Sequence, residues 1–184
     1  VGSFHLQADA ASYPELAREP EALAEVRGVD VAVPFAETFG LVSGYFPDPL
    51  AVFVRAVPRD ILEADARLAE NLQVVSGSWD LADGRIVLGQ ELARRLGVRT
   101  GDTVRLVSFA GNLNEPEQVS EVISGVFKTG FLEYDSSWAF LGLGWADGMG
   151  LREADRIGIK LRERFADRQV ARRLEAWVDD RVAV

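Results

Sequence analysis

The chain has 184 residues, 48% of them hydrophobic, so it can bury a sizeable core as one domain or as two small lobes. Its formal net charge of −9 argues against nucleic acid or an anionic membrane surface as a partner, because both attract clustered positive charge. It contains no cysteine and one histidine, which excludes disulfides and thiol chemistry and argues against a zinc site of the usual kind.

The N-terminal third of the chain predicts a unit of strand, helix, strand and strand. Residues 2–8 alternate apolar and polar side chains, which is typical of a strand. Residues 12–28 begin with a capping box and carry apolar residues at helical spacing, so we expect a helix there. Residues 29–44 and 50–57 read as two strands, and the turn-rich GYFPDP between them predicts a hairpin.

In the middle of the chain, the secondary-structure pattern is weak up to residue 84 and clear from residue 86 onward. Residues 59–70 permit a helix, although the helical pattern is broken, and residues 74–84 read as a loop with Gly77 and Gly84. Residues 86–89 then predict a short buried strand, and residues 90–97 predict a helix that ends at Gly97.

Further strands are expected after this helix. A tight turn at Gly101 and Asp102 leads into a strand over residues 104–108, and a second strand covers residues 119–127. Residues 109–118 between them read as a loop, and residues 138–143 predict one more strand.

The end of the chain returns to one strand and one helix. Residues 155–162 predict the strand, and residues 168–180 predict an amphipathic helix. The complete pattern indicates an α+β fold. We expect residues 1–57 and 151–184 to form one lobe, with a β-rich lobe of residues 58–150 inserted between them.

The segment TGFLEYDSSWAF gathers polar side chains that could form an active site. Glu133 and Asp135 would share one face of a strand, where paired carboxylates could share a proton or hold a cation. A hydrolase of this kind requires a deep pocket that holds both carboxylates. The alternative is a solvated corner between two strands. Ser136 and Ser137 are poor candidates for nucleophiles, because the only histidine is far away in the first strand.

Other candidate residues also have structural explanations. His5 is expected to pack within its strand or to lie on the surface. The glycines of GLGWADGMG lack the G-x-G-x-x-G spacing, and neither Lys128 nor Lys160 belongs to a phosphate-binding loop. Arg172 and Arg173 read as one solvated face of the last helix. We therefore expect no catalytic residue, no metal and no cofactor.

Three motifs occur in a characteristic order along the chain. They are Ile86-Val87-Leu88-Gly89 with Glu91-Leu92-Ala93 and Leu96-Gly97, then Gly101-Asp102-Thr103-Val104-Arg105-Leu106, then Gly125-Val126-Phe127 with Thr129-Gly130 and Glu133-Tyr134-Asp135-Ser136-Ser137. Together they resemble the extracytoplasmic domain of lipoprotein-releasing ABC transporter permeases of the LolC/LolE type, relatives of the MacB and FtsX permeases. The resemblance implies that residues 133–137 form a structural corner, in which Asp135 and the two serine hydroxyls cap backbone N–H groups.

The resemblance also implies a fold and a location. It implies a MacB-type α+β core with a βαβ-containing, porter-like lobe and a β-rich inserted lobe, on the periplasmic face of the bacterial inner membrane. No apolar run approaches the ~18 residues that span a bilayer, and VGSFHLQ is not a signal peptide. We therefore expect a fragment of a multi-pass protein whose membrane helices are absent here. The domain would be non-catalytic, with ATP hydrolysis in a separate cytoplasmic subunit and a second permease subunit beside it.

By the same resemblance, the transporter extracts lipoproteins from the inner membrane and passes them to a periplasmic carrier. The resemblance implies that in the LolC-like member the carrier docks on a hook-like hairpin and on a neighbouring polar pad. Arg105 matches an arginine of that pad, and Gln118 matches a glutamine of it. The loop at the hook position looks short, and Val119 replaces an expected basic residue, so a LolC-like and a LolE-like role both stay open. An alternative is a domain that transmits force to an efflux adaptor or a cell-wall hydrolase. The hook position comprises Phe109, Asn112, Leu113, Asn114, Glu115 and Pro116, whose apolar members either anchor a partner or fold back.

Overall fold

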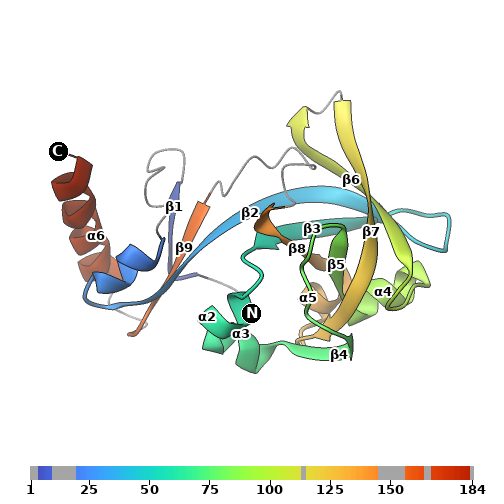
Figure 1. The fold of residues 1–184 in the computed structure, drawn as a ribbon, viewed down its shortest axis with the longest axis horizontal. Coiled ribbons are helices and arrows are strands. Elements are labelled where there is room, and N and C mark those ends of the chain that lie inside the picture. Colours follow the sequence, from blue (N-terminus) through green and yellow to red (C-terminus); the bar gives the residue numbers. More distant parts are fainter. Residues whose placement is uncertain (1–3, 10–19, 113–114, 145–155, 164–166, 183–184) are drawn as a thin grey trace. The chain divides into compact units, whose positions relative to one another are not determined.

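The computed structural model describes residues 4–9, 20–112, 115–144, 156–163 and 167–182 (Figure 1). The chain divides into two compact units, which we call the terminal unit (residues 2–35 and 154–184) and the barrel unit (residues 36–153). Strand β2 (Val29–Ser43) contributes its first half to the terminal unit and its second half to the barrel unit.

The terminal unit contains an antiparallel sheet. Strand β9 (Arg156–Leu161) lies between β1 (Leu6–Asp9) and the first half of β2. A 3-10 helix, η1 (Pro20–Glu25), precedes β2, and helix α6 (Asp167–Val182) follows β9. The strand and the amphipathic helix predicted at the end of the chain are therefore confirmed. Of the helix predicted over residues 12–28, the part before residue 20 lies outside the described residues, and η1 occupies most of the rest.

One apolar core joins the elements of the terminal unit. Val170, Leu174 and Val178 recur every four residues on α6 and are at most 9% exposed, so one stripe of the helix is buried. His5 supports the same framework, because its Nδ1 accepts a hydrogen bond of 2.8 Å from the backbone N–H of Leu161. The rest of the buried cluster comprises Leu23, Val26, Val29, Ile157, Ile159 and Leu161.

The barrel unit is a closed ring of strands. From the second half of β2, the hydrogen-bonded order runs through β3 (Leu50–Val57), β8 (Trp138–Gly142), β5 (Arg85–Gly89), β7 (Glu115–Lys128) and β6 (Thr103–Asn112). Strand β6 then pairs with β2, which completes the ring. The β3–β8 and β5–β7 pairs are parallel and the others antiparallel. A closed ring leaves none of these strands as a free edge.

The interior of the barrel is filled by aliphatic side chains. Each ring strand contributes at least one residue that is at most 1% exposed, and helix α4 (Gln90–Leu96) adds Leu92 and Leu96 to the same cluster. Full burial of one such side chain stabilises the fold by about 1.5–3 kcal/mol. The contributions from the six strands include Val42, Val54, Leu88, Leu106, Ile123 and Leu141.

Glycines direct the chain from α4 into β6. Gly97 ends the helix with a φ of +70°, and its N–H donates to the carbonyls of Ala93 and Arg94. A Cβ at this position would lie 2.6 Å from a ring carbon of Phe46. Gly101, with a φ of +92°, then forms the predicted turn before β6. Positive φ values of this size favour glycine over every other residue.

The structure refines or changes the expected elements in the first part of the barrel unit. The helical pattern over residues 59–70, which was expected to be broken, forms two short helices, α2 (Ile61–Ala64) and α3 (Ala66–Asn71), and α3 begins after Asp65, whose side chain accepts from the N–H of Leu68. Strand β4 (Gln73–Gly77) pairs with β7 where a loop was expected. The inserted unit begins at residue 36 rather than 58, because β3 belongs to the ring of the barrel.

Candidate functional site at the hairpin of β6 and β7

The two strands that flank the predicted hook form one long antiparallel hairpin. Pairing runs from Thr103 with Val122 to Ser108 with Glu117, and after an irregularity Asn112 pairs with Glu115. Most of the segment expected as a loop over residues 109–118 is therefore strand. The free end of the hairpin extends beyond the other strands of the barrel unit (Figure 1).

Arg105 and Gln118 lie on the same face of this hairpin. In the β6–β7 ladder, Arg105 pairs with Ser120, and the next pair on the same side of the sheet is Val107 with Gln118. Arg105 and Gln118 therefore lie diagonally across the two strands on one face. Both side chains are exposed, whereas the alternate positions of β6 point into the buried side of the barrel. Among the described residues, no carboxylate pairs with the Arg105 guanidinium. Its charge is therefore available to a partner.

A hollow of about 380 Å³ adjoins Arg105. Its polar groups include the hydroxyls of Ser43, Thr103 and Ser120, and no acidic side chain lines it. A guanidinium among hydroxyl groups favours a carboxylate or a carbonyl oxygen as its partner. The complete lining is Ser43, Gly44, Tyr45, Phe46, Pro47, Thr103, Val104, Arg105 and Ser120.

The turn between β2 and β3 forms the aromatic side of the hollow. The backbone N–H groups of Tyr45 and Phe46 both donate to the carbonyl of Leu96, at 3.0 and 3.3 Å. Gly44 permits this contact, because a Cβ there would lie 2.8 Å from the same carbonyl oxygen. The backbone of Tyr45 is consequently held in place, although the residue is 83% exposed. Sequence patterns did not single out these aromatic residues, since they read as part of an ordinary turn.

The described residues of the predicted hook are distributed along both strands. Phe109 is half-buried on β6, and Pro116 is exposed on β7. Asn112 and Glu115 are cross-strand partners in the backbone ladder. Leu113 and Asn114 lie outside the described residues. The hairpin therefore brings the predicted pad and the described part of the predicted hook onto the same two strands.

The corner that contains Asp135 is a helix rather than a strand. Helix α5 (Leu132–Ser137) places Asp135 where it is 7% exposed, while Glu133 is exposed, so the two carboxylates do not share one strand face. Asp135 accepts from the backbone N–H groups of Thr129 and Gly130, at 2.7 and 3.2 Å, and from the Thr129 hydroxyl at 2.8 Å. The carboxylate is thus engaged in holding the chain reversal.

The serines of this corner differ from the expectation that they cap N–H groups. The Ser136 and Ser137 hydroxyls both donate to the carbonyl of Glu133, at 3.4 and 2.6 Å. Such bonds from a hydroxyl to a carbonyl one helical turn earlier are common for serine in helices. In these bonds the serine hydroxyls donate to a backbone carbonyl and do not accept from backbone N–H groups. Neither serine makes a hydrogen bond to a histidine that could act as a base among the described residues.

Aromatic side chains form a row on the outside of the barrel. Phe39 and Phe53 are register partners on β2 and β3, each is 49% exposed, and their ring centroids lie 5.2 Å apart. The Phe53 ring stacks on Trp138 at 6.1 Å, and the Arg55 guanidinium lies 4.6 Å from the centre of the Trp138 ring. Arg55 is 7% exposed and forms an ion pair with Glu37. The ion pair between Arg55 and Glu37 therefore lies beside the row of aromatic rings.

Two further observations concern metals and membranes. Among the described residues, no group of three or more histidine, aspartate or glutamate side chains could hold a metal ion. No helix in the same part of the chain combines the length and the apolar composition needed to cross a bilayer.

Comparison with known proteins identifies the fold. No protein-family model matches the chain, and no curated protein matches it in sequence. The extracellular domain of the noncanonic ABC-type transporter YknZ from Gram-positive bacteria is similar in structure, with a TM-score of 0.60 and 14% identity. That match covers 96% of this chain and 89% of the other. The periplasmic region of MacB from Actinobacillus actinomycetemcomitans matches with a TM-score of 0.57 and 12% identity, over 95% of this chain and 77% of the other.

These similarities place the chain in a structural class. It has the α+β fold found in extracytoplasmic domains of MacB- and YknZ-type proteins, which confirms the predicted fold class. The neighbours do not single out a LolC/LolE-type protein among proteins with this fold. Because one fold can support many functions, the similarity in fold does not by itself define the function of this chain.

Proposed function

We propose that the chain is the extracytoplasmic domain of an ABC transporter permease and that it binds a protein partner through the β6–β7 hairpin. The observation that carries the proposal is the extent of the structural match, since 96% of this chain aligns with 89% of an extracellular domain from an ABC-type transporter. Because the match covers residues of both units, it is not limited to one common supersecondary motif.

The partner that we propose is a periplasmic carrier that receives lipoproteins extracted from the inner membrane. The three ordered motifs of the sequence support this choice, and the structure supports a docking face at the same positions. Arg105 and Gln118 share one exposed face, and Tyr45 stands beside the arginine. Arginine and tyrosine are among the residue types that are enriched where protein interfaces gain most of their binding energy.

In this proposal the domain moves and binds, and catalysis takes place elsewhere. A cytoplasmic ATPase subunit hydrolyses ATP, and a second permease subunit completes the membrane part. Closure of the membrane part then moves the extracytoplasmic domain, and the hairpin presents or releases the carrier. The engaged state of Asp135 supports a non-catalytic domain, because its oxygens already accept three hydrogen bonds from residues 129 and 130.

Carrier binding by the full-length permease complex tests the proposal. The complex is purified with its own ATPase, and binding of the carrier from the same organism is measured for the wild type and for Arg105→Glu. We expect the variant to bind at least about tenfold more weakly, because charge reversal turns an attraction into a repulsion. Arg99→Glu is the matched control, since the Arg99 side chain is 89% exposed on the same barrel and lies outside the hollow.

Three outcomes distinguish carrier docking at the hairpin, docking elsewhere and a different kind of partner. Loss of binding in Arg105→Glu alone supports docking at the hairpin. Equal binding by Arg105→Glu and Arg99→Glu contradicts it. Recovery of an efflux adaptor or a cell-wall hydrolase in place of a lipoprotein carrier would replace the lipoprotein role with force transmission to that partner.

A further inference from the structure

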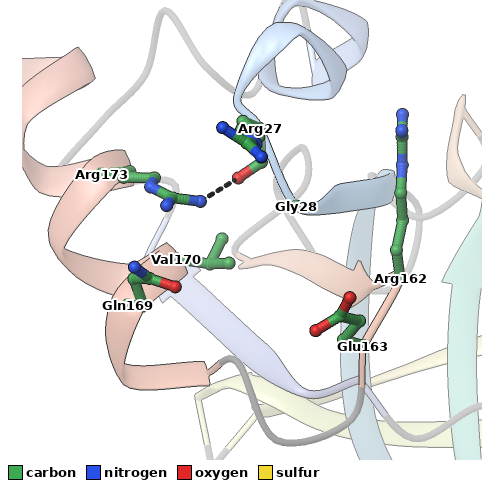
Figure 2. A pocket seen from close by; sticks show the side chains of 7 residues that line it. All are labelled: Arg27, Gly28, Arg162, Glu163, Gln169, Val170 and Arg173. Atoms are coloured by element: carbon green, nitrogen blue, oxygen red, sulfur yellow. Dashed lines mark hydrogen bonds between the residues drawn. The ribbon is translucent and has the colours of Figure 1, made fainter.

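A second hollow, of about 500 Å³, lies within the terminal unit, far in sequence from the hairpin. It forms where β2 begins, β9 ends and α6 completes its first turn (Figure 2). Three of its lining residues are arginines, and one is acidic. The lining consists of Arg27, Gly28, Arg162, Glu163, Gln169, Val170 and Arg173.

Backbone carbonyls hold two of the arginines in place. Arg173 Nη1 donates to the carbonyl of Arg27 at 2.9 Å, and Arg162 Nε donates to the carbonyl of Val29 at 3.1 Å. Each guanidinium has five N–H donors, so each retains others for a ligand. Figure 2 shows Arg27 and Arg173 on one side of the hollow and Arg162 on the other. The three arginines thus line the hollow from different segments of the chain.

The charge around this hollow is opposite to the charge of the chain. Among the described residues, no ion pair involves Arg27, Arg162 or Arg173, and in Figure 2 the Arg162 side chain extends away from Glu163. The chain as a whole has 29 acidic and 20 basic residues, yet residues 162–173 contain five arginines and only two acidic residues. Arginines around one hollow repel one another, and the single carboxylate of the lining, Glu163, offsets only part of their charge, so a bound anion relieves the remaining repulsion.

The position of α6 beside β2 depends on one glycine. Gly28 has a φ of +106°, and a Cβ there would lie 2.7 Å from Cγ2 of Val170. Val170 is 1% exposed in the core of the unit, so the first turn of α6 is fixed against the start of β2. Arg173 is therefore mounted on a packed helix, while Arg27 lies in the turn before β2 and Arg162 directly follows the last residue of β9.

We propose that this hollow binds a phosphate group. Guanidinium groups bind phosphate through two parallel N–H···O bonds, and three of them around one hollow can neutralise a dianion or the headgroup of an anionic lipid. The phosphate can come from a soluble compound or from a lipid headgroup, and the chemistry of recognition is the same for both. This site shares no residue with the docking face, so the proposal stands or fails independently of the proposed function.

Titration of the chain distinguishes the two sources. Inorganic phosphate and glycerol 3-phosphate are the soluble probes, and binding is followed by calorimetry and by the amide signals of residues in the first turn of α6. Vesicles of phosphatidylglycerol are compared with vesicles of phosphatidylcholine in a flotation assay. Binding of a soluble probe identifies a soluble source. Binding to phosphatidylglycerol vesicles without binding of the soluble probes identifies a lipid source.

Variants decide whether the arginines are responsible. Arg27→Gln and Arg162→Gln should each weaken binding by about tenfold, which corresponds to the loss of one charge-assisted hydrogen bond. Arg27→Gln is the safer variant for folding, since the carbonyl of Arg27 makes the bond to Arg173 and remains present. Arg172→Gln is the control, because Arg172 is exposed on α6 and does not line the hollow.

The proposal is supported if binding weakens in both pocket variants and persists in Arg172→Gln. It is overturned if neither soluble phosphate nor phosphatidylglycerol binds the wild type. Binding that is equal in the wild type and in folded Arg27→Gln overturns it as well. Thermal unfolding of each variant establishes that the fold is intact before binding is compared.

Discussion

Replacing Asp135 by alanine should destabilise the barrel unit by about 2–4 kcal/mol. The carboxylate is 7% exposed and accepts from two backbone N–H groups and one hydroxyl, at 2.7, 3.2 and 2.8 Å. A hydrogen bond to a charged group contributes about 1.5–3 kcal/mol, and a buried donor left without an acceptor costs about 1–3 kcal/mol. The three bonds share one carboxylate and are therefore not additive, which keeps the expected loss below their sum.

Urea unfolding of the wild type, Asp135→Ala and Asp135→Asn measures this effect. Asparagine keeps the shape and one carbonyl oxygen, so we expect it to lose about half as much stability as alanine. Glu133→Gln is the matched control, because Glu133 is exposed two residues away and its carbonyl, not its carboxylate, accepts the serine hydroxyls. An unfolding midpoint for Asp135→Ala equal to that of Glu133→Gln would refute the structural role of the carboxylate.

Three further substitutions test other parts of the barrel unit. Gly97→Ala should lower the free energy of unfolding in urea by at least about 1–2 kcal/mol, because alanine is strained at the φ of +70° and its Cβ would lie 2.6 Å from the ring of Phe46. Arg55→Ala should lower the free energy of unfolding by about 2–3 kcal/mol. In a double-mutant cycle with Glu37→Ala, the double variant should lose less stability than the two single variants together, and a loss equal to their sum would contradict a stabilising pair. The hydrogen bond from Arg94 lowers the pKa of Glu91, so Arg94→Gln should raise that pKa toward its ordinary value in an NMR titration, and an unchanged pKa would contradict the cause. Because the folded-state pKa of Glu91 is lowered, the stabilisation is present at neutral pH and is lost as the pH falls through that pKa.

Local patterns along the sequence predicted most strands but not the closure of the barrel. Alternation and turn residues identified the β2–β3 hairpin, the strand of β5 and the glycine-ended helix α4, since each depends on neighbours in the chain. Closure depends on pairs such as Gly40 with Ser108, which join strands far apart in sequence. Nothing in the local pattern of β6 specifies that it pairs on both sides.

The candidate site was predictable in its residue types and less so in its geometry. The glycine, asparagine and proline residues of 109–118 are poor strand formers, so the segment read as a loop. Pairing with an established neighbouring strand overrides that preference and extends the hairpin to Asn112 and Glu115. The partly buried position of Arg173 was also missed, because charged residues on an amphipathic helix normally face solvent.

Crosslinking in the membrane tests the central proposal most directly. A photoreactive amino acid replaces Gln118 in the full-length permease, and irradiation of intact cells captures whatever protein touches this face of the hairpin. The proposal predicts a crosslink to an extracytoplasmic lipoprotein carrier that is absent when the same group replaces Arg99. Capture at position 118 that does not exceed capture at position 99 would contradict docking on the β6–β7 hairpin.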